Sequence, residues 1–79
     1  MIYRLNEEKT GMMVDFESEL ELEIFKENFS LEDIDWSQLN EDTVFITALC
    51  SQDLDEAQIL EVESELEFVE ECIKENQEG

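Results

Sequence analysis

Apolar and polar residues alternate over two short stretches near the start of the chain, and this pattern predicts two β-strands. The first stretch covers residues 1–5. In the second, residues 12–17, apolar side chains fall on one side and carboxylates on the other. The polar segment 6–11 between them ends at Gly11, which can take the positive φ angle of a tight turn. The two strands are therefore expected to form a hairpin.

Two patterns fit the next segment, residues 18–29. Ser18 and Glu21 have the spacing of a capping box, and Leu and Glu favour helix, so a helix is preferred here. Apolar and acidic residues also alternate strictly up to residue 24, as in a long strand that continues from residue 12. The helix would turn inward Leu20, Ile24 and Phe25. It would turn outward Glu19, Glu23 and Glu27.

The middle of the chain carries one clear strand signal. Residues 30–40 are expected to be a connection with a short helical turn, anchored by Ile34, Trp36 and Leu39. Residues 43–50 alternate with apolar content on both sides, which is typical of a central strand.

The last segment predicts a long helix that Asp53 caps, with Glu56 as its capping-box partner, and that ends near Asn76. Spacings of three and four give a core stripe of Ile59, Val62, Leu66, Val69 and Ile73. The carboxylates that fall away from this stripe are Glu56, Glu63, Glu67, Glu70 and Glu71. A second, weaker stripe consists of Ala57, Leu60, Ser64 and Phe68. That stripe leaves two roles open: packing under the first helix, or contact with a partner or a second copy.

These elements predict an α+β fold of order ββαβα, with a small antiparallel three-stranded sheet, two helices packed on it and a long C-terminal helix. The chain has no proline and no low-complexity linker or repeat, so residues 1–79 are expected to form a single acidic domain.

The net charge of the chain is the feature that says most about its function. Its 24 acidic and 4 basic residues give a net charge of −20, while 42% hydrophobic residues are enough to build a core. Self-repulsion of this size destabilises a compact state. A globule of this length exposes about 5,000 Å², or roughly 250 Å² for each net charge. Gathered on half of the surface, the charge would nearly match the density of duplex DNA, at roughly 100 Å² per charge. The acidity therefore points to a role outside stability.

Several kinds of chemistry are unfavoured. Without histidine there is no ordinary general base near neutral pH, and two glycines cannot make a phosphate-binding loop, so the chain is not expected to be an enzyme. The acidic clusters lack the spacing of a calcium loop, so we expect no metal and no cofactor. Cys50 and Cys72 are expected to be reduced and largely buried. We see no leader or membrane span, and expect a cytoplasmic protein.

Carboxylates three or four positions apart on a helix lie about 5–6 Å from each other, close to the phosphate spacing of nucleic acid. We therefore expect an acidic inhibitor that mimics nucleic acid and binds a basic nucleic-acid-binding protein or nuclease, not nucleic acid or a membrane. A homodimer is a further expectation. The expected contact residues are Glu19, Glu23, Glu27, Glu56, Glu63, Glu67, Phe68, Glu70 and Glu71. In size and charge alone, the chain resembles small acidic phage inhibitors of the anti-restriction, anti-CRISPR and glycosylase-inhibitor kinds.

Three alternatives stay open. An immunity or antitoxin-like module would cap one basic partner without copying nucleic-acid geometry. In a halophilic protein the acidity would serve solvation, although Glu far outnumbers Asp here. A cation buffer would bind Ca²⁺ weakly.

Overall fold

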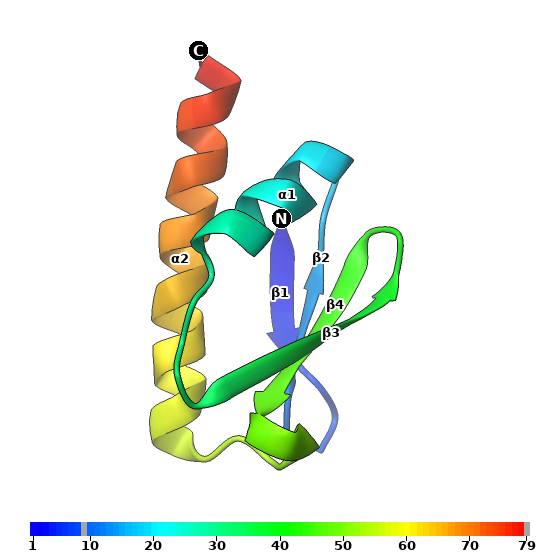
Figure 1. Cartoon of the computed structure of the whole chain (residues 1–79), viewed down its shortest axis with the longest axis vertical. Coiled ribbons are helices and arrows are strands. Elements are labelled where there is room, and N and C mark those ends of the chain that lie inside the picture. The colour runs from blue at the N-terminus through cyan, green and yellow to red at the C-terminus, as the bar shows by residue number, and fades with distance from the viewer. Residues whose placement is uncertain (9, 79) are drawn as a thin grey trace.

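The computed structural model describes residues 1–8 and 10–78. A β-hairpin comes first, from β1 (Ile2–Leu5) and β2 (Met12–Asp15), and is followed by α1 (Glu19–Asn28). A second hairpin joins β3 (Ile34–Asn40) to β4 (Thr43–Ala48). The short 3₁₀ turn η1 (Leu49–Ser51) then leads to α2 (Glu56–Glu78), which lies along the whole molecule in Figure 1.

The four strands form one antiparallel sheet in the order β1-β2-β4-β3. The α+β class and the long C-terminal helix are confirmed, but the expected three-stranded ββαβα arrangement is wrong, because residues 34–40 form a strand. Ile34 and Trp36 of β3 pair with Ala48 and Ile46 of β4. Only these two inward residues give β3 an apolar side. Since β3 is an edge strand with largely exposed polar residues, its alternation is weak in the sequence.

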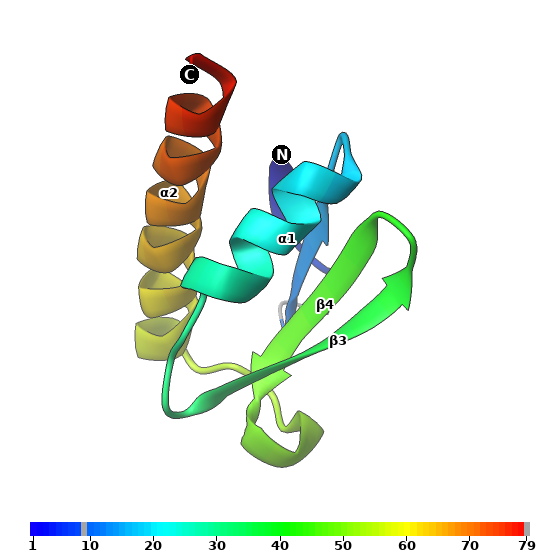
Figure 2. The same ribbon diagram turned by 45° about the horizontal axis from the view of Figure 1, so that its top comes forward.

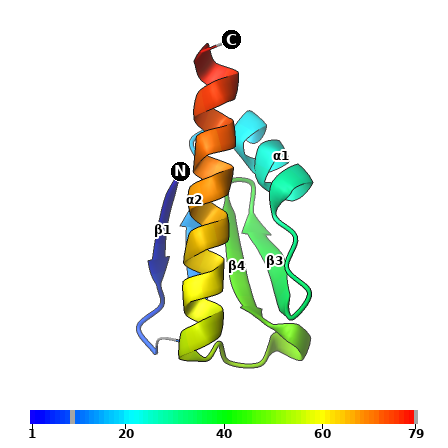
Figure 3. The same ribbon diagram turned by 90° about the vertical axis from the view of Figure 1, so that its left-hand side faces the viewer.

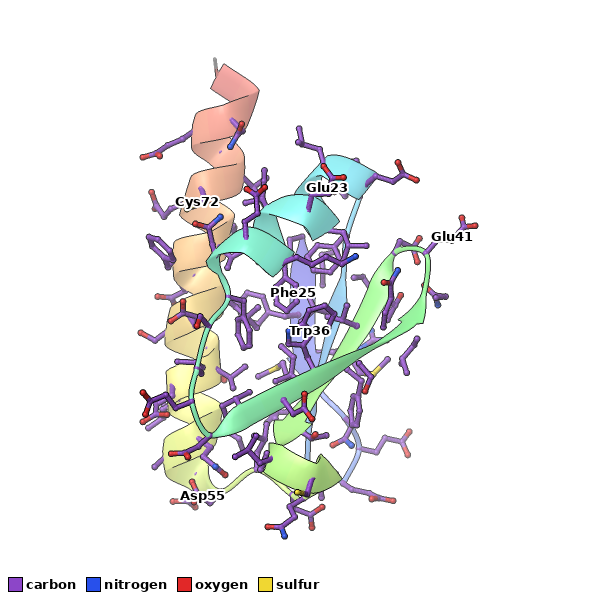
Figure 4. All side chains as sticks on the ribbon, viewed as in Figure 1. Glu23, Phe25, Trp36, Glu41, Asp55 and Cys72 are labelled. Carbon is purple, nitrogen blue, oxygen red and sulfur yellow. The ribbon has the colours of Figure 1, made fainter. Side chains whose placement is uncertain are left out.

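Both helices pack on the same face of the sheet (Figures 1 and 3). Phe25 of α1 is fully buried at the centre of this packing. Its ring centroid lies 5.4 Å from that of Phe16, 4.8 Å from that of Phe29 and 5.1 Å from that of Trp36, which it meets edge-on. Figure 4 shows Phe25 and Trp36 pointing toward each other between helix and sheet. Such aromatic contacts add to the apolar burial that holds α1 in place.

The expected helix over residues 18–29 is confirmed, and Figure 2 shows it lying between α2 and the β3–β4 hairpin. The Ser18 hydroxyl accepts the Glu21 N–H at 3.4 Å, as a helix cap does. The buried Glu21 carboxylate accepts the N–H of Glu17, not that of Ser18, at 3.1 Å, and the Met1 amino group lies 3.1 Å from the same oxygen. The prediction of inward residues was wrong at one position: Leu20 is exposed, and Leu22 is buried in its place.

The cap of the long helix lies two residues later than expected. Asp55, not Asp53, caps α2: its carboxylate accepts the Gln58 N–H at 2.8 Å, and the Gln58 side chain accepts the Asp55 N–H at 3.1 Å. The expected core stripe is confirmed, with Val62, Leu66, Val69 and Ile73 buried. Ile59 packs against the core at its edge.

The strand before α2 is shorter than expected. β4 ends at Ala48, and Cys50 follows with a φ of 61°, in the left-handed region that few residues other than glycine adopt. Both cysteines are free, but the expected burial is wrong for Cys50, which is exposed, while Cys72 is half-buried. None of the helices in the described part of the chain is long and apolar enough to cross a membrane.

Candidate acidic interface

The carboxylates are unevenly divided between the two layers of the fold. α1 carries four and α2 nine of the 24 acidic residues, whereas the four strands together carry only Asp15 and Asp35. The helices contribute only two cations, Lys26 and Lys74. The molecular surface is 5290 Å², about 260 Å² for each net charge. The helices therefore carry a net charge of −11 out of −20, and because both lie on one side of the sheet, that side is more acidic than the opposite side.

One flank of α2 carries a row of carboxylates along most of its length. Glu56, Glu63, Glu67 and Glu70 follow one another at intervals of seven, four and three residues. These intervals correspond to rises of about 10, 6 and 4.5 Å along the helix axis. Glu56 and Glu67 are exposed, while Glu63 and Glu70 are half-buried toward β1. The row therefore borders the edge of the sheet. The sequence had suggested instead that these carboxylates stand away from the core.

A groove of about 510 Å³ lies where this row meets β1. Helix α2 supplies most of the residues that line this groove, and Tyr3 of β1 supplies the rest. The lining residues are Tyr3, Ser64, Glu67, Phe68, Glu70, Glu71 and Lys74. Two aromatic side chains thus share a hollow with three carboxylates. Phe68 is 52% exposed, and Lys74 forms a loose surface ion pair with Glu70 at 3.8 Å.

The chemistry of Tyr3 reports on the electrostatics of this groove. Partial burial raises the pKa of its phenol above the ordinary value of 10.0, and the negative charges of Glu67, Glu70 and Glu63 raise it further. The three carboxylates oppose formation of a fourth anion among them. The same field would favour a cationic side chain entering the groove, where the aromatic faces of Tyr3 and Phe68 could also receive it.

A second, smaller groove of about 320 Å³ lies between α1 and the β3–β4 hairpin. It is lined by Glu19, Leu22, Glu23, Lys26, Gln38 and Glu41. In Figure 4, Glu23 on α1 and Glu41 at the tip of the β3–β4 hairpin both lie in the upper half of the view, where α1 lies. Gln38 of β3 and Glu41 of the hairpin turn thereby join the acidic row of α1.

The structure places six of the nine expected contact residues in the two grooves and leaves three outside them. The groove beside β1 brings together Glu67, Phe68, Glu70 and Glu71, and the groove beside the hairpin brings together Glu19 and Glu23. Glu27, Glu56 and Glu63 line neither groove. Glu27 is exposed near the end of α1, and Glu63 lies close enough to Tyr3 to raise its pKa. Glu56 lies at the opposite end of the α2 row, next to Asp55 at the base of the helix in Figure 4.

Sequence reasoning missed Tyr3 and Lys74 in the first groove and Gln38 and Glu41 in the second, and it named Ser64 only as part of the second stripe of α2. Tyr3 is one of several apolar residues in a short strand, and only the sheet order shows that it lies on an edge beside α2. The second apolar stripe of α2 does not pack under α1, because Leu60 and Phe68 are both exposed. Among the described residues no group of three or more possible ligands could hold a metal ion.

No protein-family model, curated protein or solved structure matches this chain, so its own residues are the basis for any functional inference.

Proposed function

We propose that this protein is an acidic inhibitor that acts in the cytoplasm and occupies the Lys- and Arg-lined nucleic-acid site of a basic protein, such as a nuclease, restriction enzyme or CRISPR effector. The observation that supports this most strongly is the placement of thirteen of 24 carboxylates on two helices that share one side of the sheet, of which only Glu21 is known to be buried. Such a surface attracts cationic sites and repels nucleic acid itself.

The spacing of the α2 row supports mimicry of a phosphate backbone. Neighbouring carboxylates on a helix lie about 5–6 Å apart, and phosphates along one strand roughly 6–7 Å apart. Glu63, Glu67 and Glu70 follow at helical neighbour positions, and Glu56 extends the row by two turns. A groove that neutralises successive phosphates could therefore pair with successive carboxylates of α2. Association would be fast, electrostatically steered and weakened by salt.

The groove beside β1 favours a second candidate, a plug that caps one basic site without copying nucleic-acid geometry. Phe68 and Tyr3 line the same groove as the carboxylates. An exposed aromatic residue next to charged residues is typical of an interface anchor. In that case binding energy would be concentrated on Phe68 and two or three carboxylates. In mimicry the energy would be spread along the row.

The test starts with the immobilised protein, used to capture basic proteins from a bacterial lysate at low salt, with elution by a salt gradient. The captured protein is then assayed with labelled duplex DNA and with labelled RNA. Displacement of either nucleic acid, weakening as salt rises, is the expected result. A partner that keeps its nucleic acid while bound to this protein would contradict mimicry.

Two triple variants with the same net charge sharpen the test. E67Q/E70Q/E71Q removes three charges from the groove beside β1, whereas E7Q/E8Q/E32Q removes three exposed charges from loops. We expect the first to lose displacement at least tenfold and the second to lose little. Equal losses would mean that only total charge matters. F68A separates the candidates: a loss larger than that of any single Glu→Gln change along the row favours the plug.

A further inference from the structure

The side of the sheet opposite the helices is open, since none of the described helices covers it (Figures 1 and 3). The strand pairing places one residue of each strand in a row across this face: Arg4, Met13, Phe45 and Ser37. Met13 and Phe45 are half-buried at its centre, and Ile2, 63% exposed, stands beside them on β1. An apolar centre with polar ends is the usual pattern of a protein interface.

The net charge of the strand residues on this face is only −1, in contrast to the helical side. Its charged residues are Arg4, Asp15 and Asp35, of which Asp15 accepts a hydrogen bond from the Thr43 hydroxyl at 2.8 Å. Among the described residues, no carboxylate lies within ion-pair distance of Arg4. Two copies of a chain with a net charge of −20 repel each other wherever their helical sides approach. The open sheet face is where that repulsion is smallest.

We propose that two copies of this chain associate through their open sheet faces. A two-fold axis parallel to the strands would place β1 of one copy opposite β3 of the other. Arg4 then lies opposite Ser37 on the partner copy's β3, and Asp35 lies two residues from Ser37 on the same face of that strand. Symmetry repeats the Arg–Asp pair at the other edge, and the Met13 and Phe45 side chains of both copies meet at the centre. Sheets packed in this way lie about 10 Å apart.

The dimer leaves both helical layers facing outward, so it does not depend on the proposed inhibitor function and would present two acidic surfaces at once. Its response to salt is also opposite in sign. Salt screens the repulsion between two acidic copies and strengthens the dimer, whereas it weakens binding to a basic partner. The two kinds of association can therefore be told apart in one salt series.

Sedimentation equilibrium of the whole chain, at low salt and in about 0.5 M salt, tests the proposal. We expect a monomer–dimer equilibrium whose dissociation constant falls as salt rises. I2E and L60E form a matched pair, because Ile2 is 63% and Leu60 66% exposed, and each change adds one negative charge. I2E should raise the dissociation constant at least about tenfold, while L60E on α2 should change it little.

The geometry is tested by exchanging the charges at the two edges. R4E should weaken the dimer, and R4E/D35R should restore it, with circular dichroism showing that each variant is folded. A monomer under all conditions up to high protein concentration would overturn the proposal. Weakening by L60E but not by I2E would overturn it as well, because the contact would then lie on the outer stripe of α2.

Discussion

The ring of Phe45 lies directly against Gly11, across the outer face of the sheet. A Cβ atom added at Gly11 would come within 2.7 Å of the Phe45 ring carbon Cε2 and 2.8 Å of the Ile46 carbonyl oxygen. Gly11 does not have the positive φ expected of it in the turn, since no described glycine does. This glycine is needed for close approach between two strands, not for backbone conformation.

Replacing Gly11 with alanine should therefore destabilise the fold. The Phe45 ring could turn away, but the Ile46 carbonyl belongs to the backbone of a central strand, so strand spacing must change. We expect G11A to lower the free energy of unfolding by about 1–3 kcal/mol, measured by urea denaturation. In a background of F45A the same change should cost less. An unchanged stability of G11A would mean that the two strands can separate freely at this point.

The cap of α2 gives a second prediction, with a matched control two residues away. D55A removes the carboxylate that accepts the Gln58 N–H, so we expect a loss of about 0.5–2 kcal/mol in the free energy of unfolding. D53A removes the same charge before the helix begins, and should have a much smaller effect. A larger effect of D53A would show that the helix begins earlier, at the cap first expected from the sequence.

The only tyrosine of the chain gives a direct probe of the groove beside β1. In an alkaline titration of phenolate absorbance, the Tyr3 midpoint should lie above 10.0 in the folded protein. Added salt should lower it by screening the carboxylates. E67Q/E70Q should also lower it, whereas E7Q/E8Q should leave it nearly unchanged. A midpoint that neither salt nor E67Q/E70Q moves would contradict the charged groove.

The sign of the effect on stability follows from the direction of that shift. Because the pKa is higher in the folded than in the unfolded chain, the fold favours the protonated phenol. This contribution is fully present below pH 10.0, the ordinary value, and is lost as the pH rises through the folded-state pKa. We expect Y3F to remove that alkaline loss, and unfolding curves of both proteins above and below pH 10 would measure it.

The acidic row of α2 should lower the stability of the protein. Glu67 lies three or four positions from Glu63, Glu70 and Glu71, and like charges at these spacings each destabilise a helix by about 0.2–0.5 kcal/mol. We expect E67Q/E70Q/E71Q to raise the free energy of unfolding by about 0.5–1 kcal/mol at low salt, even after the weak pair with Lys74 is lost. The gain should shrink as salt is added.

Thermal unfolding in a salt series measures this effect and also tests the halophilic alternative. A protein that is folded at low salt and gains modestly from added salt fits the present interpretation. A chain that needs molar salt to fold at all would indicate that its acidity serves solvation.

Much of this protein follows from the sequence because local periodicity and capping decide it. The stripe of Val62, Leu66 and Val69 predicts α2 and its buried side, and Ser18 with Glu21 predicts α1, since helix spacing and cap geometry involve only near neighbours along the chain. For residues 18–29 the sequence favoured a helix but also fitted a strand, and the structure decided for the helix.

Only the tertiary structure decided which strands are neighbours and which residues therefore meet. β3 is stabilised by pairing with β4, not by its own weak alternation, and was missed for that reason. The groove joins Tyr3 to Phe68 across 65 residues of chain, and Gly11 is required because Phe45 lies against it. Long-range pairing depends on the packing of the whole sheet, and no local pattern records it.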